Sequence, residues 1–425
     1  MMIKRIVLCL LVFCTLSANA MAADVPVIVQ LGPLGNILNV VNVLGGTLLD
    51  QIPGTKIYLL KLPNIPIISP LLQGILGIVF VEPDKIVPVP ARSQMGVLTT
   101  GHTTAADWYK AQPNLAKIRS TNAQSYSRGT GIVIADLNSS VDFAHPALAG
   151  HLTGGYDFVG ARAGYAGTLN QAGAGFLDQA GAGFLDQAGA GFLDQAGAGF
   201  LDQNAASFLD PAVAAALGNG KPAYAHGTLC AGVIAAVAPG ATIMPLRVFD
   251  DSGNTDVFSV AKAIRYAVNN GARVINMSFG MGGTYSAIQN SLAYAASNHV
   301  VVVASAGNQN TQTAQFPASV SSVLSVASTD GADVKAWFSN YGSTVFVTAP
   351  GVNIISAFPG GYYGMVSGTS FSAPMVAAEA ALIMAVKTTD PKTVISSHTV
   401  NINGQNLAYV GKLGYGRVDV FSAVQ

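Results

Sequence analysis

The chain has 425 residues, which is enough for more than one domain. Lysine plus arginine and aspartate plus glutamate number 21 each, so no net charge favours binding to nucleic acid or to an anionic surface. Charged residues make up 10% of the chain and hydrophobic residues 50%, which excludes a disordered protein and favours large buried sheets.

Residues 1–22 have the pattern of a secretory signal peptide. Lys4 and Arg5 form a short positive region, and an apolar run follows that is too short for a stable membrane anchor. Two small-residue cleavage motifs end the segment, Ala18-Asn19-Ala20 and Ala20-Met21-Ala22. We therefore expect a secreted or periplasmic protein with no membrane association after signal cleavage. An uncleaved anchor or a buried N-terminus is the alternative.

Residues 23–92 are predicted to form a small α+β domain. Strands are expected at 25–31, 56–62 and 77–84, and a helix at 37–44. Its place between a signal peptide and a larger domain indicates a propeptide, although a permanent N-terminal domain is also open. The polar stretch 93–114 is predicted to be a processing linker, because exposed polar segments are where proteolysis concentrates.

Residues 115–425 alternate between short β-rich runs and helical stretches. Helices are expected at 257–269 and 285–298, and strands at 132–137, 273–277, 300–304, 323–326 and 345–348. Strands separated by helices of this length predict an α/β fold with a doubly wound parallel sheet and helices on both faces.

One segment, within residues 160–222, breaks this alternation. The octapeptide Gln-Ala-Gly-Ala-Gly-Phe-Leu-Asp recurs there and places Phe176, Phe184, Phe192, Phe200 and Phe208 in register. We interpret it as a duplicated low-complexity surface insertion. The aspartates in register also leave open a calcium-binding repeat, although the nonapeptide spacing of calcium β-rolls is missing. An adhesin or assembly module built on this repeat is a further alternative.

Two short motifs carry candidate catalytic residues. Ser370 lies in Gly-Thr-Ser-Phe-Ser-Ala-Pro (368–374) before an Ala-rich run, so it is expected at a helix start, and Pro374 suits a first turn. His226 opens His-Gly-Thr-Leu-Cys-Ala-Gly (226–232), and histidine is the usual general base near neutral pH. A helix cap and a structural histidine are the alternatives when each motif is taken alone.

Together the two motifs resemble the subtilisin-like serine peptidases. His-Gly-Thr-x-x-Ala-Gly and Gly-Thr-Ser-x-x-Ala-Pro are two of the three signatures of that family, and the chain order of acid, histidine and serine matches. The resemblance extends from about residue 115 to 425 and implies the subtilisin-like fold. It also implies a serine endopeptidase in which Ser370 is the nucleophile and His226 its base.

The resemblance assigns further roles. It makes Asn308, in the run Val-Val-Val-Ala-Ser-Ala-Gly-Asn (301–308), the side-chain donor of the oxyanion hole. Residues 278–280 and 304–306 resemble the walls that pair with an extended substrate, and Gln315 falls near the floor of the first specificity pocket, where it would shorten that pocket. Cys230, the one cysteine outside the signal segment, is expected to be an inert buried residue, with a redox or metal role as the alternative.

The family relationship also sets expectations for partners and cofactors. We expect polypeptide substrates, the chain's own propeptide as an intramolecular inhibitor, a monomer, and no nucleic acid partner. No cofactor is required for the chemistry. Structural calcium is common in the family, but the sequence shows no convincing ligand cluster for it.

The third signature departs from the family pattern at the catalytic acid. Counting back from His145-Pro146 and forward from Gly129-Thr130-Gly131 both place Asn138 where the family has aspartate. A gapped alignment would instead make Asp136 the acid. Asparagine can accept a hydrogen bond from the imidazole, but it supplies no negative charge.

Asp136 lies two residues earlier on the same expected strand, so its side chain would share a face with that of Asn138. It could supply charge through Asn138 or a water, or it could be a buried carboxylate paired elsewhere. Two functions therefore remain open: a weakened or rewired peptidase, and a pseudopeptidase that binds extended peptides.

Overall fold

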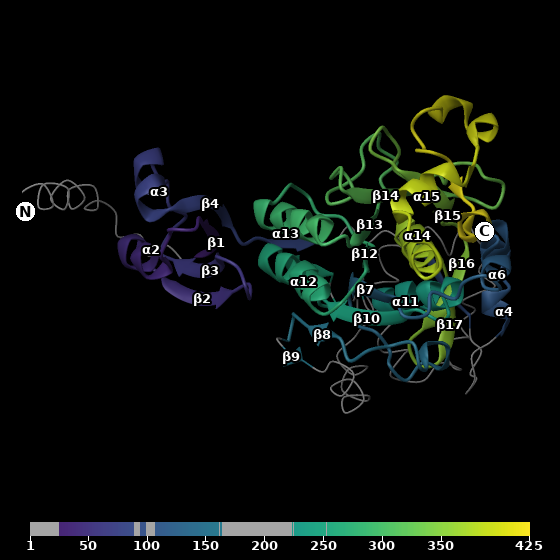
Figure 1. The fold of residues 1–425 in the computed structure, drawn as a ribbon, viewed down its shortest axis with the longest axis horizontal. Helices are drawn as coiled ribbons and strands as arrows, with labels where there is room; N and C mark the ends of the chain where they lie inside the picture. Colours follow the sequence, from purple (N-terminus) through teal and green to yellow (C-terminus); the bar gives the residue numbers. More distant parts are fainter. Residues whose placement is uncertain are drawn as a thin grey trace, which may run out of the picture. The chain divides into compact units, whose positions relative to one another are not determined.

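The computed structural model describes residues 25–88, 94–98, 107–160, 162–163, 223, 225–251 and 253–425 (Figure 1). The predicted signal peptide and the octapeptide repeat lie outside the described residues. The chain divides into two compact units, Met1–Lys85 and Ile86–Gln425. Among the helices of the described residues, none combines the length and the apolar character needed to cross a membrane.

The N-terminal unit is the expected α+β structure, a four-stranded antiparallel sheet of order β2-β3-β1-β4 with two helices. Alternating strand residues such as Val27, Val29, Leu60 and Leu62 form its core. Asn36 caps the first helix by accepting a hydrogen bond from the Leu38 amide. The elements are β1 (Val25–Leu31), α2 (Ile37–Leu44), β2 (Thr47–Gln51), β3 (Ile57–Leu62), α3 (Pro70–Leu76) and β4 (Ile78–Pro83).

The second unit is built on a ten-stranded sheet of order β18-β19-β15-β14-β13-β12-β7-β10-β8-β9. All neighbours from β19 to β8 pair in parallel, and the two outermost strands are antiparallel. In chain order the strands are β7 (Val133–Asn138), β8 (Tyr156–Asp157), β9 (Arg162–Ala163), β10 (Thr242–Arg247), β12 (Val274–Met277), β13 (Val301–Ser305), β14 (Val323–Thr329), β15 (Val347–Pro350), β18 (Thr399–Val400) and β19 (Arg417–Val418).

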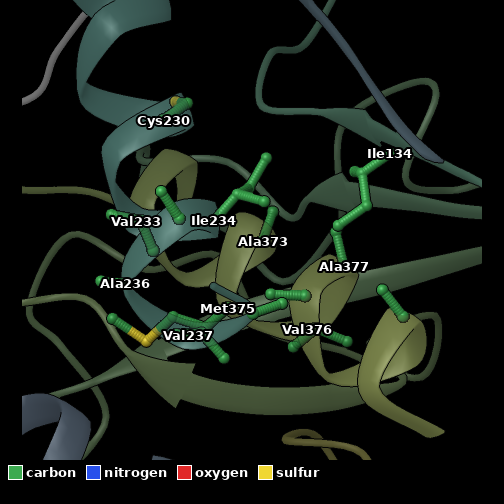
Figure 2. Close-up of a cluster of buried hydrophobic side chains, with 14 of the residues drawn as sticks. Ile134, Cys230, Val233, Ile234, Ala236, Val237, Ala373, Met375, Val376 and Ala377 are labelled. Carbon is green, nitrogen blue, oxygen red and sulfur yellow. The ribbon is translucent and has the colours of Figure 1, made fainter. Parts of the chain in front are cut away.

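Long helices cover both faces of this sheet, as the sequence predicted. Figure 1 shows α12 (Val257–Asn269) and α13 (Ser286–Ser297) on one face, and α11 (His226–Val237) and α14 (Thr369–Met384) on the other. Small residues on α11 and α14 let the two buried helices approach closely, and Val233, Val237, Met375 and Val376 fill the space around them (Figure 2). The shorter helices are α4 (Asp107–Lys110), α5 (Pro113–Lys117), α6 (Ser120–Ala123), α15 (Pro391–Ser397), α16 (Val420–Val424) and the 3₁₀ turns η1 (Pro146–Leu148), η3 (Asn403–Gln405) and η4 (Leu407–Tyr409).

The segment 93–114 contains more regular structure than its polar composition suggested. Strand β6 (Gln94–Leu98) pairs antiparallel with β17 (Tyr362–Ser367), which also pairs with β16 (Ile354–Phe358). Just before it, β5 (Ile86–Pro88) pairs antiparallel with β11 (Asn254–Asp256). Strand pairing uses backbone groups, so a segment without an apolar pattern can add to an open sheet edge.

Candidate active site

The candidate residues meet at the carboxyl ends of the central parallel strands, the edge where open α/β sheets bind ligands. Asn138 is the last residue of β7, and Asn308 follows the end of β13 by three residues. His226 and Ser370 are the first and second residues of α11 and α14, which lie on one face of the sheet. The chain thus brings together four residues that span more than half of the sequence.

Asn138 lies against the imidazole of His226. Its Oδ1 is 2.7 Å from His226 Nδ1 and also accepts a hydrogen bond from the Ser139 amide at 2.9 Å. Close approach of the two segments requires glycine at 227, because a Cβ there would collide with the carbonyl oxygens of Ser139 and Ser140. The amide therefore orients the ring with its proton on Nδ1, leaving Nε2 as the basic nitrogen.

Asp136 is buried behind Asn138 and does not reach the imidazole directly. Its carboxylate accepts hydrogen bonds from Asn138 Nδ2 at 3.3 and 3.4 Å and from Asn276 Nδ2 at 2.7 Å. Burial raises the pKa of Asp136 to about 7, and the two amide hydrogen bonds only partly oppose that effect.

Burial also shifts the pKa values of His226 and Cys230. Desolvation lowers the pKa of His226 to about 4, so the imidazole is neutral at physiological pH, the state a general base requires. Cys230 packs 3.8 Å from His226 Nδ1 and 3.5 Å from the Ser370 carbonyl oxygen. Burial, with the nearby Asp136, raises the pKa of this thiol well above its usual range, so it stays protonated and unreactive.

Ser370 is held by Ser278 on both its backbone and its side chain. Its Oγ donates to the Ser278 carbonyl at 3.1 Å, and its own carbonyl accepts from Ser278 Oγ at 2.8 Å. Pro374 makes the second contact available, because it has no N–H to donate to the carbonyl four residues earlier. The expectation of Pro374 in the first helical turn was wrong: it is the sixth residue of α14, and the helix is kept by packing in the core.

Asn308 is fixed beside the start of α14. Its Oδ1 accepts hydrogen bonds from the backbone N–H and the hydroxyl of Thr369, at 2.9 and 2.7 Å. Because Thr369 takes the carbonyl end of this amide, the NH₂ end is the one that can donate to a developing oxyanion next to Ser370.

Gln315 lies between the two segments expected to form the substrate walls. A Cβ on Gly280 would overlap the Gln315 side chain, and Gln315 Nε2 contacts the Ser305 carbonyl oxygen at 3.4 Å. The glutamine therefore fills the space between residues 278–280 and 304–306. The shortened first specificity pocket stays a prediction.

Sequence reasoning missed the role of Asn276, which lies on β12 level with Asp136 on β7. Its one sequence signal is a polar residue inside a buried strand run, and such groups need partners. Asp142, the second aspartate of the segment, accepts from the Ala144 amide within its own turn and from the Gly360 amide of a distant segment. Among the described residues, no group of three or more His, Cys, Asp or Glu side chains is placed to hold a metal ion.

Comparison with known proteins identifies the family that this chain resembles in sequence. The profile of the subtilase family, peptidase S8, matches residues 129–416. Thermitase from Thermoactinomyces vulgaris is 33% identical over 321 residues, covering 73% of this chain and 94% of thermitase. Subtilisin Savinase from Lederbergia lenta is 34% identical over 217 residues, covering 49% of this chain and 78% of that protein.

Solved structures agree on the fold. Fervidolysin from Fervidobacterium pennivorans, described as a keratinolytic enzyme related to subtilisin, superposes with a TM-score of 0.68 at 24% identity, covering 96% of this chain and 62% of fervidolysin. The subtilisin-like fold expected from the sequence is confirmed. The match of the family profile over most of the chain, together with the thermitase relationship, shows that the chain belongs to the subtilase family of serine endopeptidases.

Proposed function

We propose that this chain is an exported serine endopeptidase, made as a zymogen, that works with an Asn138–His226–Ser370 triad. The observation that carries the proposal is the 2.7 Å contact between Asn138 Oδ1 and His226 Nδ1 at the start of α11. Asparagine there performs the orienting part of the acid's role without its charge.

Peptide-bond hydrolysis would proceed through an acyl-enzyme. The Ser370 hydroxyl leaves the Ser278 carbonyl, turns to His226 and attacks the substrate carbonyl while Nε2 takes its proton. Asn308 Nδ2 and the Ser370 backbone N–H donate to the oxyanion. His226 returns the proton to the leaving amine, and a water molecule then releases the acid product by the same steps. No cofactor takes part in this chemistry.

The neutral asparagine is expected to lower kcat. Loss of the triad acid lowers kcat of subtilisin by about 3 × 10⁴, because the imidazolium that forms in each step then lacks its counter-charge. His226 begins from a low pKa, so the need for such a charge is acute. An active enzyme therefore requires compensation within the site.

The zymogen part of the proposal rests on the arrangement along the chain. A separate α+β unit precedes the peptidase unit, and β5 and β6 tie the connecting segment into the peptidase unit through β11 and β17. We propose that residues 23–92 act as an inhibitory propeptide, that cleavage falls near residues 91–110, and that the mature enzyme is a monomer acting on polypeptides. Export rests on the signal pattern of residues 1–22. Structural calcium stays a prediction without a ligand cluster among the described residues.

The test compares wild type with Ser370→Ala. Wild-type protein should react with a fluorophosphonate probe and shorten itself near residues 91–110, whereas Ser370→Ala should do neither and should accumulate at full length. Ser372→Ala is the matched control, since Ser372 lies on the same helix with its hydroxyl bonded to Ser328 Oγ. A folded wild type that neither labels nor processes would contradict the proposal.

A peptide-binding pseudopeptidase is the second candidate, and the absence of charge at Asn138 favours it. It predicts that wild type and Ser370→Ala bind an extended peptide equally and that neither turns it over. Turnover lost in Ser370→Ala would rule this function out.

A further inference from the structure

Three side chains form a line that runs from the interior of the sheet to the base. Asp136 and Asn138 lie on one face of β7, because residues two apart in a strand share a face. Both carboxylate oxygens of Asp136 lie 3.3–3.4 Å from Asn138 Nδ2, and Asn138 Oδ1 lies 2.7 Å from His226 Nδ1. The amide therefore bridges a carboxylate and an imidazole.

Asp136 determines which way this bridging amide points. With the observed orientation, the NH₂ group faces the carboxylate and the oxygen accepts from the Ser139 N–H and the imidazole N–H. A flipped amide would set its oxygen against the carboxylate and its NH₂ against two N–H donors. The carboxylate and the Ser139 N–H together select the orientation that holds the proton of His226 on Nδ1.

Among the described residues, no positively charged side chain pairs with Asp136. On one side Asn276 donates to it, and on the other β10 brings Pro245 level with it. Arg247, level with Asn138 on β10, is ion-paired with Asp157 at 3.2 Å and Asp251 at 3.4 Å. The titratable groups that face the carboxylate are His226, through Asn138, and Cys230, both from α11.

We propose that Asp136 is a positioning residue that supplies, through Asn138, the amide orientation and the negative charge that a triad aspartate otherwise provides. This inference rests on the proposed peptidase function. When the Ser370 O–H bond breaks and an N–H bond forms at His226 Nε2, the imidazolium keeps its Nδ1 proton and donates it to Asn138 Oδ1. Asn138 stays a neutral amide, and the balancing charge stays on Asp136.

The charge has a characteristic pH dependence. Burial raises the pKa of Asp136 to about 7, so its carboxylate is neutral below that pH and ionised above it. The ionised form is the one that stabilises the imidazolium, so kcat should rise as the pH increases through about 7. The change in kcat that titration of His226 causes lies at much lower pH, because the pKa of His226 is about 4.

The experiment moves the carboxylate between the two positions. Four proteins are compared from pH 5 to 10 with a fluorogenic peptide: wild type, Asp136→Asn, Asn138→Asp, and the double variant carrying both changes. Asp142→Asn is the matched control, because it makes the same chemical change at a carboxylate whose hydrogen bonds are to the backbone amides of Ala144 and Gly360. Peptide mass spectrometry confirms that residue 138 of the wild type is still an amide, and thermal melts confirm that each protein folds.

We expect Asp136→Asn to lower kcat by about 10- to 100-fold, the effect of one charge about 7 Å away in a protein interior. KM should be unchanged, and the rise of kcat near pH 7 should disappear. The double variant should recover at least the wild-type kcat, since its carboxylate contacts His226 directly. Asn138→Asp should gain less, because two adjacent buried carboxylates share a proton. Asp142→Asn should keep the wild-type kcat.

Several results would overturn the inference. Wild-type kcat and pH profile in Asp136→Asn would show that the charge has no role. A loss that the double variant fails to recover would show a purely structural role, and a wild type hydrolysed to aspartate at 138 would make the bridge irrelevant. An inactive wild type would overturn both this inference and the proposed function, whereas an active wild type with an unaffected Asp136→Asn would overturn this inference alone.

Discussion

Asparagine and aspartate at residue 138 have nearly the same shape, and His226 distinguishes them mainly when it carries a proton. The neutral ring needs an acceptor for Nδ1–H, and Asn138 Oδ1 provides one at 2.7 Å. The protonated ring also needs a counter-charge, and the nearest one in this arrangement is Asp136, one amide further away. The substitution therefore separates orientation from charge, two roles that one carboxylate combines in other members of the family.

The role of Asn308 as the oxyanion donor can also be tested with a single substitution. Asn308→Ala should lower kcat by about 10²–10³, the contribution of the corresponding asparagine in subtilisin, with little change in KM because the donor acts on the transition state. The measurement is steady-state kinetics on the fluorogenic peptide. Thr311→Ala, at an exposed position three residues further along the same loop, is the control. An equal loss in both variants would indicate a disturbed loop instead of a lost donor.

At the scale of elements, the beginning of α14 is assembled from contacts with other segments. Ser278 bonds to both the hydroxyl and the carbonyl of Ser370, and Asn308 bonds to Thr369. Pro374 leaves the Ser370 carbonyl without its helical donor, which frees it for Ser278. The nucleophile is thus positioned by the loops after β12 and β13 as well as by its own helix.

The segments that follow β12 and β13 also lead to a prediction about substrate specificity. Gln315→Ala should remove the side chain between Gly280 and Ser305 and so deepen the space between the substrate walls. We expect kcat/KM to increase by about tenfold for peptides with a large apolar residue before the scissile bond, the value of a few buried methylene groups, and to change little for alanine at that place. A peptide series measures this, and parallel changes for both substrates would contradict a pocket role.

At the scale of the whole molecule, two buried carboxylic acids make stability depend on pH. Burial raises the pKa of Glu379, on α14, to about 8 and that of Asp136 to about 7. Both oxygens of Glu379 lack hydrogen-bond partners among the described residues. Because the folded pKa values exceed the unfolded ones, these groups stabilise the fold in their neutral form. This contribution is complete below the unfolded pKa values near 4, and it is lost progressively as the pH rises from there through the folded values of about 7 and 8.

We therefore expect wild type to lose stability progressively from about pH 4 to pH 8, and the variant Glu379→Gln with Asp136→Asn to lose much less over the same interval. At about 1.4 kcal/mol per pKa unit, each site contributes at most roughly 5 kcal/mol. Chemical denaturation of the Ser370→Ala background, which prevents self-digestion, measures the free energy of unfolding at each pH. Parallel curves for the two proteins would show that neither carboxyl group titrates in this range.

The sequence by itself determined the fold and the positions of the base and the nucleophile. His226 and Ser370 lie in contiguous motifs at helix starts, and the alternation of apolar strands and helices predicted the doubly wound sheet, because these signals act over a few neighbouring residues. The ends of the predicted strands were right to within about three residues. The run expected at 323–326 continues to Thr329, and the run expected at 345–348 is a strand at Val347–Pro350, where pairing with β14 sets the limits.

Only the tertiary structure decided which side chains surround Asn138, the residue in the place of the triad acid. Sequence alignment favoured Asn138 over Asp136 but could not place either side chain, and the packing of α11 on β7 places the first against His226 and the second behind it. Asn276, 140 residues from Asp136, became its partner only because β12 and β7 are neighbours in register. Such contacts depend on strand order and register, which are properties of the assembled sheet, so no local pattern of residues reveals them.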